Sequence, residues 1–164
     1  MDSAGVGGGE VMCGRYGWYH TGAELVAYFG VHRVEEALDE LELRYNIAPT
    51  DPMPVVREEC GERVLERMRW GLVPFWAEDL KVGASMINAR CEGVAQKPAF
   101  RHALRQRRCL VPASGFYEWV RRPDGKQPLH IRRKDGAPLA FAGLWEEWRG
   151  PEGPVRTYCI LTCP

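Results

Sequence analysis

The stretch RCLVPASGFYEWVRRPDGKQPLHIRR, residues 108–133, decides the expected fold of this chain. It contains short apolar or alternating segments, which are typical of β-strands, and the sequence PDGK between two of them is typical of a tight turn. The same pattern continues after the turn sequences KDGAP and RGPEGP. The strands predicted in this way are 108–112, 116–121, 128–133, 139–145 and 155–161. Five short strands in succession predict an antiparallel meander.

Helical patterns come earlier in the chain. Residues 23–29 place apolar side chains at helical spacing before Gly30, and the acidic stretch 34–43 predicts a second short helix with a solvated face. The prolines at 49, 52 and 54 predict a break in regular structure, after which residues 63–70 alternate like a half-buried strand. Residues 98–107 predict a helix with Pro98 in its first turn and arginines on its outer side. Together the segments predict an α+β fold, with a curved, barrel-like antiparallel sheet flanked by short helices.

The charge of the chain is unevenly distributed. The 164 residues carry 22 Lys and Arg against 22 Asp and Glu, so the formal net charge is zero. Residues 81–134, however, hold thirteen basic and only three acidic side chains, which leaves nine basic and nineteen acidic residues elsewhere. Attraction of a polyanion depends on where charge lies, so the neutral total does not exclude nucleic-acid binding.

Composition excludes several other classes of protein. The longest apolar runs fall far short of the ~18 residues that a membrane span needs, and the N-terminus lacks a secretory signal, so we expect a cytoplasmic protein with no membrane partner. The six cysteines include no C-x-x-C pair and are not spaced with the four histidines as zinc ligands would be. We therefore expect neither a metal nor a cofactor. All cysteines except Cys13 are expected to be free, buried, small apolar residues in a reducing compartment, where disulfides are not needed.

The N-terminus offers one distinctive chemical possibility. Residues 1–11 are glycine-rich and aperiodic, and we expect them to be disordered or to lie upstream of a true start at Met12. Removal of Met12 would leave Cys13 with a free α-amine, whose pKa of about 7.7–8.0 keeps part of it neutral at pH 7. Such an amine can attack an aldehyde, and the neighbouring thiol can then close a five-membered thiazolidine ring. A Met-Cys start alone is nevertheless unremarkable.

Further motifs give this start a context. They occur in a fixed order: MCGRY (12–16), RYNIAPT (44–50), MRWGLVPFWAED (68–79), INAR (87–90), KPAFR (97–101), RRCLVPASGFYEW (107–119) and FAGLWE (141–146). In this order the sequence resembles the SRAP family, the SOS-response-associated peptidases that process abasic sites, over residues 12–162. The resemblance implies an SRAP-like domain from residue 12 to residue 164.

The resemblance also implies roles for individual residues. Cys13 matches the catalytic cysteine that links covalently to the ring-opened sugar of an abasic site in single-stranded DNA. Asn88 matches the asparagine that holds cysteine and sugar in place, and Glu118 matches the glutamate that acts as general acid and base. Read without the family, Asn88 could be a helix cap and Glu118 a strand-surface residue. The aromatic residues beside Glu118 in the sequence would shield its carboxyl from water. This would raise its pKa toward the working pH of a group that transfers protons.

The remaining implied residues would contact DNA. Arg15 and Trp76 resemble residues that grip the backbone and wedge against the bases, and Arg90 matches an arginine on the flanking phosphate. Arg101 belongs to the basic 97–108 block, which would contact phosphates. Read without the family, Trp76 could be a core residue, although aromatic stacking is the expected companion of a basic groove.

One motif of the family is absent. Members of the family continue past the last predicted strand into an I-H-x-R-M-P sequence with a further active-site histidine, and this chain stops before it. None of the four histidines matches that position. We therefore expect a domain that is incomplete at its C-terminus, lacks the last strands and has reduced activity.

The sequence-based prediction is a monomeric abasic-site processing protein of the DNA-damage (SOS) response. It would bind single-stranded DNA and form a thiazolidine crosslink through Cys13, a lyase-like activity. Two alternatives remain open. Cys13 could be the nucleophile of a peptidase, a protein hydrolase that removes its own N-terminal extension. Alternatively, Cys13 could be structural in a protein that only reads DNA without a covalent bond.

Overall fold

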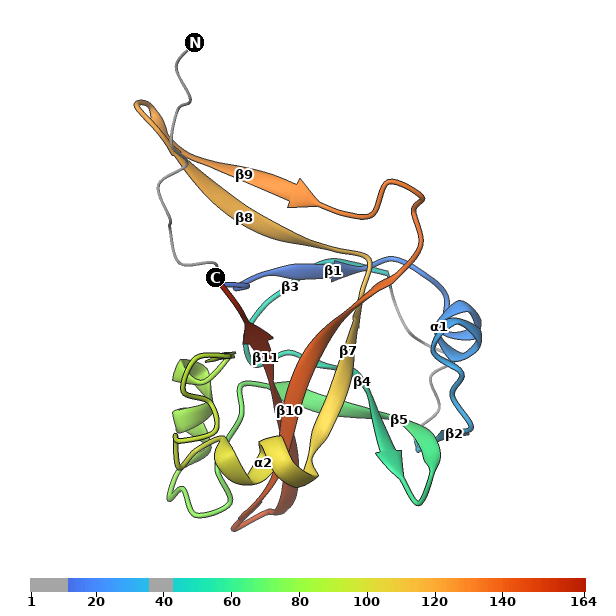
Figure 1. Cartoon of the computed structure of the whole chain (residues 1–164), viewed down its shortest axis with the longest axis vertical. Helices are drawn as coiled ribbons and strands as arrows, with labels where there is room; N and C mark the ends of the chain where they lie inside the picture. The colour runs from blue at the N-terminus through green and yellow to red at the C-terminus, as the bar shows by residue number, and fades with distance from the viewer. Residues whose placement is uncertain (1–11, 36–42) are drawn as a thin grey trace.

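The computed structural model describes residues 12–35 and 43–164, and this part of the chain is mostly β-structure (Figure 1). A five-stranded barrel forms its centre. Neighbouring strands run antiparallel in the order β5 (Glu62–Trp70), β4 (Pro52–Glu59), β7 (Arg108–Ala113), β10 (Leu139–Gly150) and β11 (Gly153–Thr162). β11 then closes the barrel on β5 through two parallel residue pairs. The predicted barrel-like sheet is confirmed, and its closing pair makes it mixed rather than purely antiparallel.

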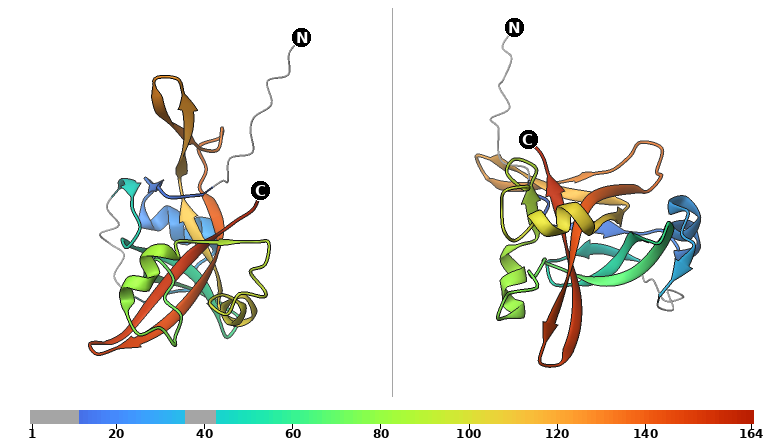
Figure 2. Two further views of the ribbon diagram at one scale, coloured as in Figure 1. Left: turned by 90° about the vertical axis from the view of Figure 1, so that its left-hand side faces the viewer. Right: turned by 60° about the horizontal axis from the view of Figure 1, so that its bottom comes forward.

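A second, four-stranded sheet lies against one end of the barrel (Figure 2). Its order is β3 (Arg44–Ile47), β1 (Tyr16–Trp18), β8 (Gly115–Arg122) and β9 (Gly125–Ile131). The β8–β9 hairpin extends away from the barrel in all views (Figures 1 and 2). Gly115 allows this hairpin to form, because a Cβ atom there would lie 2.5 Å from the His130 side chain.

Shorter elements complete the fold. β6 (Asn88–Arg90) runs parallel to β11, and β2 (Arg33–Val34) runs parallel to β5. Three short helices occur in the described ranges: α1 (Gly22–Phe29), the 3-10 helix η1 (Leu80–Ser85) and α2 (Arg101–Gln106). None of these helices is long and apolar enough to cross a lipid bilayer.

Most of the predicted elements are confirmed. The 23–29 helix is α1, which begins with a capping box between Thr21 and Glu24 and ends at Gly30 in a left-handed conformation. β5 and the five later strands lie within a few residues of their predicted bounds. The 98–107 helix is shortened to α2, with Ala103 buried and Arg105 exposed. The predicted 34–43 helix lies mostly outside the described residues, which omit 36–42.

The prediction that prolines interrupt regular structure near residue 52 was wrong. β4 begins at Pro52 and continues through Pro54. β4 pairs with β5 along its whole length, but its pairs with β7 are at Val56 and Arg57 only. Both prolines therefore lie where the β7 side of the strand is unpaired, and their missing N–H groups break no ladder hydrogen bond.

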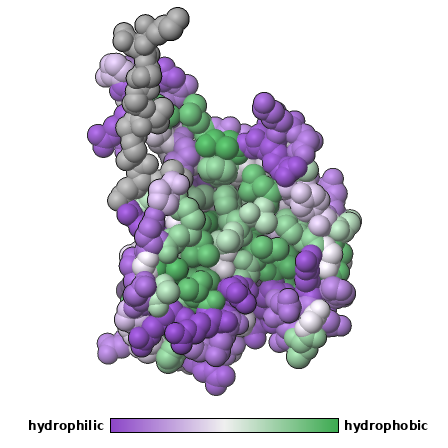
Figure 3. Space-filling view, in the orientation of Figure 1, coloured by the Kyte–Doolittle hydropathy of each residue, from purple (hydrophilic) through white to green (hydrophobic). Residues whose placement is uncertain are grey.

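The main core fills the barrel below the four-stranded sheet. Tyr16 is fully buried and packs edge-on against Trp70 at 5.2 Å, and its hydroxyl shares a 2.7 Å hydrogen bond with that of Tyr158. Cys13 belongs to the same cluster. On the surface, hydrophobic residues gather over β7 and β10 in the middle of the face shown in Figure 3, with hydrophilic residues around them.

The cysteines require a correction. Cys109 and Cys159 are buried and free, as predicted, but Cys60 is exposed. Cys91 and Cys163 form a disulfide. The tertiary structure brings them together because Arg90 and Thr162 are paired between β6 and β11, so that the next residue of each strand lies beside the other.

Candidate functional site

Cys13 lies three residues before the first residue of β1, and the start of β1 lies near the C-terminal end of β11 (Figure 1). The side-chain amide of Asn88 donates a hydrogen bond from Nδ2 to the Cys13 carbonyl oxygen at 3.1 Å. β6 places Asn88 there through its parallel pairing with β11, where Asn88 is opposite Ile160. Asn88 Oδ1 is buried and accepts no hydrogen bond from the described residues. The amide thus holds the cysteine backbone with one end and leaves an acceptor available at the other.

Glu118 reaches the same region from β8. Its Oε1 atom is buried and receives no hydrogen bond within the described part of the chain. Burial raises the pKa of the Glu118 carboxyl above its ordinary value, because desolvation disfavours the charged form. A carboxyl with a raised pKa holds its proton more readily, which is what a general acid requires.

The Cys13 thiol is deeply buried, with 3% of the residue exposed. Burial, and then the nearby negative charge of Glu118, raise the pKa of the thiol to about 12, against a smaller opposing effect of a hydrogen bond with the Arg15 backbone. At neutral pH the thiol is therefore protonated. This is the reverse of the environment that produces a reactive thiolate.

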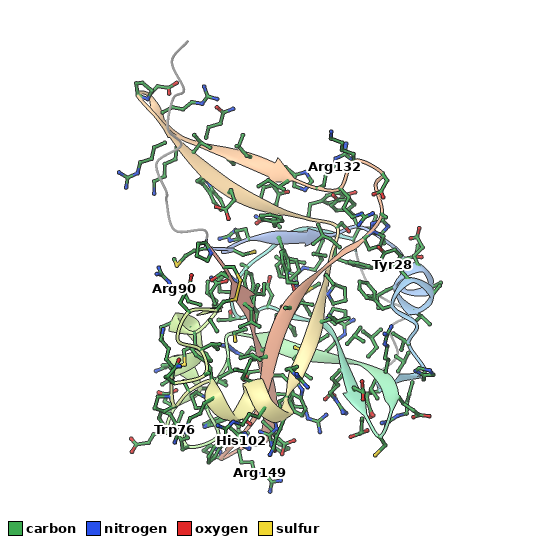
Figure 4. The ribbon with its side chains drawn as sticks, in the orientation of Figure 1. Tyr28, Trp76, Arg90, His102, Arg132 and Arg149 are labelled. Atoms are coloured by element: carbon green, nitrogen blue, oxygen red, sulfur yellow. A yellow bond between two sulfur atoms is a disulfide. The ribbon has the colours of Figure 1, made fainter. Side chains whose placement is uncertain are left out.

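Arg15 is two residues further on and points to another surface. Its Nη1 donates a 2.9 Å hydrogen bond to Asn46 Oδ1 of β3, and its carbonyl oxygen accepts from the Tyr117 backbone amide at 3.0 Å. Arg90 is exposed at the end of β6 and lies beside the C-terminal end of β11 (Figure 4). The structure therefore brings together three of the seven residues singled out in the sequence, Cys13, Asn88 and Glu118. Arg15 and Arg90 lie two residues along the chain from Cys13 and from Asn88, respectively.

The other two residues lie elsewhere. Trp76 is 55% exposed, so it is not a core residue, and it lies with His102 and Arg149 at the end of the barrel opposite Arg90 (Figure 4). Arg101 is the first residue of α2 and precedes His102, so it belongs to the same distant end. A DNA contact of these two side chains remains a prediction, separate from the Cys13 region.

The four histidines have other partners. His20 lies near Glu24, and His32 accepts a hydrogen bond from the Arg63 backbone amide. His102 lies near Glu146, and His130 packs against Tyr117. Sequence reasoning missed the Tyr16–Tyr158 hydroxyl pair and the Asn46 partner of Arg15. Tyr16 and Asn46 stand inside recognised motifs, but their partners are 142 and 31 residues away in the sequence.

Comparison with known proteins identifies the family. The family model of the SOS response associated peptidase (SRAP) matches residues 12–164. The chain is similar to the abasic site processing protein YoqW of Bacillus subtilis, at 40% identity over 155 residues, covering 92% of this chain and 68% of that protein. It is also similar to the abasic site processing protein YedK of Escherichia coli, at 30% identity over 81% of this chain and 59% of YedK.

A solved structure agrees in fold. A crystal structure of a protein from Bacteroides thetaiotaomicron matches with a TM-score of 0.81 at 24% identity, covering 92% of this chain and 68% of that one. The family match extends from the cysteine segment through both sheets to the end of β11. The chain therefore belongs to the SRAP family, the SOS response associated peptidases.

Proposed function

We propose that this protein processes abasic sites in single-stranded DNA by linking them covalently to Cys13, after removal of Met12 exposes the Cys13 α-amine. One observation carries the proposal: the Asn88 amide holds the Cys13 backbone by a hydrogen bond, in a place where the Glu118 carboxylate lies close enough to raise the pKa of the thiol. The names of the similar proteins, which process abasic sites, support the choice of substrate.

The proposed chemistry begins at the amine. The α-amine of Cys13 adds to the C1′ aldehyde of the ring-opened sugar, and loss of one water gives an imine. The Cys13 sulfur then bonds to the imine carbon, while the thiol proton is transferred to the imine nitrogen, which closes the thiazolidine. The net reaction releases one water and needs no oxidant.

The side chains of the site suit these steps. The Glu118 carboxyl, whose pKa is raised by burial, can exchange a proton with the departing hydroxyl of the first adduct and later with the thiol. Asn88 Oδ1 is an available acceptor for the amine. Arg90 and Arg15 supply positive charge beside Cys13 for the phosphates on either side of the lesion.

The raised pKa of Cys13 weighs against the peptidase alternative. A cysteine peptidase attacks with a thiolate, which an adjacent base or positive charge must stabilise. Here burial and the Glu118 charge both favour the neutral thiol. In the thiazolidine route the neutral amine attacks first, and the thiol reacts only afterwards, within the same residue.

The test is adduct formation with a single-stranded oligonucleotide that carries one abasic site. Protein that begins at Cys13 should give a band of retarded mobility on a denaturing gel. Cys13→Ala should give none, and the matched control Cys60→Ala, at an exposed free cysteine, should react normally. Protein that retains residues 1–11 should not react.

Two results would overturn the proposal. An adduct that forms equally well with the N-terminal extension attached would exclude the amine as nucleophile. Binding to the abasic oligonucleotide without any adduct, unaffected by Cys13→Ala, would instead support a non-covalent reader of DNA.

A further inference from the structure

The Cys91–Cys163 disulfide joins the ends of two strands beside the proposed reactive residue. Cys91 follows the last residue of β6, and Cys163 follows the last residue of β11. The parallel ladder between these strands is three residue pairs long. Just beyond it, the Cys91 backbone amide donates a 2.9 Å hydrogen bond to the Thr162 carbonyl oxygen. The disulfide therefore closes the C-terminal end of the short ladder that positions Asn88.

The N-terminal end of β6 is held in a different way. The backbone carbonyl of Ile87, directly before β6, accepts hydrogen bonds from the Trp70 indole and from the Ile160 backbone amide, each at 3.0 Å. Both donors belong to the buried core. After β6 the chain continues through turns at residues 91–96, most of which are exposed. The core thus fixes one end of β6, whereas the other end depends on the short ladder and on the disulfide.

The cysteines of the chain differ in their access to solvent. Cys91 and Cys163 are exposed, whereas Cys109 and Cys159 are buried. Cys13 is 3% exposed, and burial raises the pKa of its thiol, so little thiolate is present at neutral pH. Thiol–disulfide exchange requires a thiolate that can reach the other sulfur. A mild oxidant would therefore close the exposed pair and leave the Cys13 thiol intact.

The barrel core does not depend on this disulfide. Cys91 and Cys163 both lie outside the two buried clusters of the described residues. Exposed disulfides are reduced more readily than buried structural ones, and in compartments that keep thiols reduced such bonds are usually transient. Opening the bond would therefore leave the barrel folded and act on the C-terminal end of β6.

We propose that Cys91 and Cys163 form a reversible redox switch that controls how firmly β6 holds Asn88 on Cys13. In the oxidised form the disulfide fixes β6 to β11, and the Asn88 amide donates its 3.1 Å hydrogen bond to the Cys13 carbonyl oxygen. In the reduced form the C-terminal end of β6 separates from β11 more often, and Asn88 then leaves this position. The inference rests on the proposed function in taking crosslinking as the activity that changes.

The oxidant belongs to the class of low-molecular-weight disulfides, for example glutathione disulfide. The thiolate of one cysteine attacks a sulfur of the small disulfide, so that one small thiol leaves and a mixed disulfide forms. The second cysteine then attacks the protein sulfur of the mixed disulfide, and the second small thiol leaves. Two electrons pass from the cysteine pair to the small disulfide, whose two sulfurs take up the two protons. An excess of the small thiol reverses both steps.

The first test follows β6 itself, without DNA. Hydrogen exchange of residues 88–91 is compared after equilibration with glutathione disulfide or with dithiothreitol, and all samples are reduced after quenching. The Cys91 amide should exchange at least about tenfold more slowly in the oxidised protein, because a crosslink restricts opening. Cys163→Ser should exchange at the reduced rate under both conditions. Cys60→Ser, at an exposed free cysteine, is the matched control and should change like the wild type.

The second test measures single-turnover adduct formation with an abasic-site oligonucleotide, after removal of glutathione disulfide or dithiothreitol. Oxidised protein that begins at Cys13 should react at least about threefold faster than reduced protein, since small displacements of reacting groups have large effects on rate. Cys163→Ser should react at the reduced rate in both cases, and Cys60→Ser should respond like the wild type. Peptide mass spectrometry of the same samples checks that the Cys13 thiol is unmodified.

Three outcomes would overturn the inference. They are absence of the disulfide in excess glutathione disulfide, equal exchange of residues 88–91 in the oxidised and reduced wild type, and a redox effect on crosslinking that persists in Cys163→Ser. Equal crosslinking rates of the two forms in an active protein would also contradict the proposed control of Asn88.

Failure of the proposed function would give a different result. A wild type that forms no adduct in either state, but whose exchange at residues 88–91 slows when Cys91 and Cys163 are joined, would refute only the proposed function. An active crosslinker whose exchange and rate ignore the redox state would refute only the switch.

Discussion

The Asn88 side chain and the Cys13 backbone are joined by a 3.1 Å hydrogen bond across 75 residues of sequence. This bond connects the segment before β1 to β6, which is itself fixed to the barrel by β11. The backbone of Cys13, whose side chain belongs to the main core, is thereby also held by a side chain from a distant strand.

Loss of this hydrogen bond should slow the proposed crosslinking. Asn88→Ala leaves the Cys13 carbonyl without its donor, and a small displacement of reacting groups can cost about 100-fold in rate. We expect a rate about 10- to 100-fold lower, measured by single-turnover adduct formation on a denaturing gel. Gln96→Ala, at an exposed position in the segment after β6, is the control and should react normally. A normal rate in Asn88→Ala would mean that the hydrogen bond is not used.

Glu118 should make the stability of the protein depend on pH. Its folded-state pKa is raised, so the folded protein retains a proton that the unfolded chain loses. The stability therefore falls as pH rises from the ordinary glutamate pKa through the raised value, and Glu118→Gln should abolish this fall. Melting temperatures from pH 4 to pH 8 should diverge in favour of Glu118→Gln as pH increases. Glu58→Gln, on the exposed end of β4, should follow the wild type.

Alkylation should distinguish Cys13 from Cys60. Cys13 is 3% exposed and has its pKa raised to about 12, whereas Cys60 is exposed at the β4–β5 turn. Iodoacetamide at pH 7.5 should therefore modify Cys60 first and leave Cys13 largely unmodified in the folded protein, as read by peptide mass spectrometry. Preferential labelling of Cys13 would contradict both the burial and the direction of its pKa shift.

The Cys91–Cys163 disulfide should stabilise the folded chain under oxidising conditions. The two residues are 72 positions apart, and a crosslink of this kind typically contributes about 2–4 kcal/mol by restricting the unfolded state. Cys163→Ser should lower the melting temperature of oxidised protein but not of reduced protein. Digestion without reductant should release a linked pair of peptides, and their absence would show that the thiols remain free.

Gly83→Ala should destabilise the protein by about 1–3 kcal/mol, the usual cost of overpacking. A Cβ atom on Gly83 would lie 2.4 Å from the Gly71 carbonyl oxygen, so the backbone of η1 or of the segment after β5 would have to move. Gly14→Ala is the matched control, because no atom lies within 4 Å of its Cβ position. Urea denaturation measures both, and equal stability of the two variants would contradict the close approach.

Local patterns were sufficient for much of this fold. The alternation of residues 63–70 and the PDGK turn specified β5 and the β8–β9 hairpin, because strand periodicity and turn chemistry act within a few residues. The Pro52–Glu59 strand was missed because the rule that proline breaks a strand holds only where its N–H would be needed. Whether it is needed depends on where β7 pairs with β4.

The sequence by itself determined the family, most of the strands and the identity of Cys13, Asn88 and Glu118 as candidates, since ordered motifs and local patterns need no coordinates. Only the tertiary structure decided their arrangement. It joined Asn88 to Cys13 by a hydrogen bond and placed Trp76 and Arg101 at a distant end of the barrel. It also paired Cys91 with Cys163. Finally, it put Tyr117 and Trp119 on the face of β8 opposite Glu118. Each of these relationships depends on strand register and on contacts between distant segments, and one residue of register reverses the face to which every side chain of a strand points.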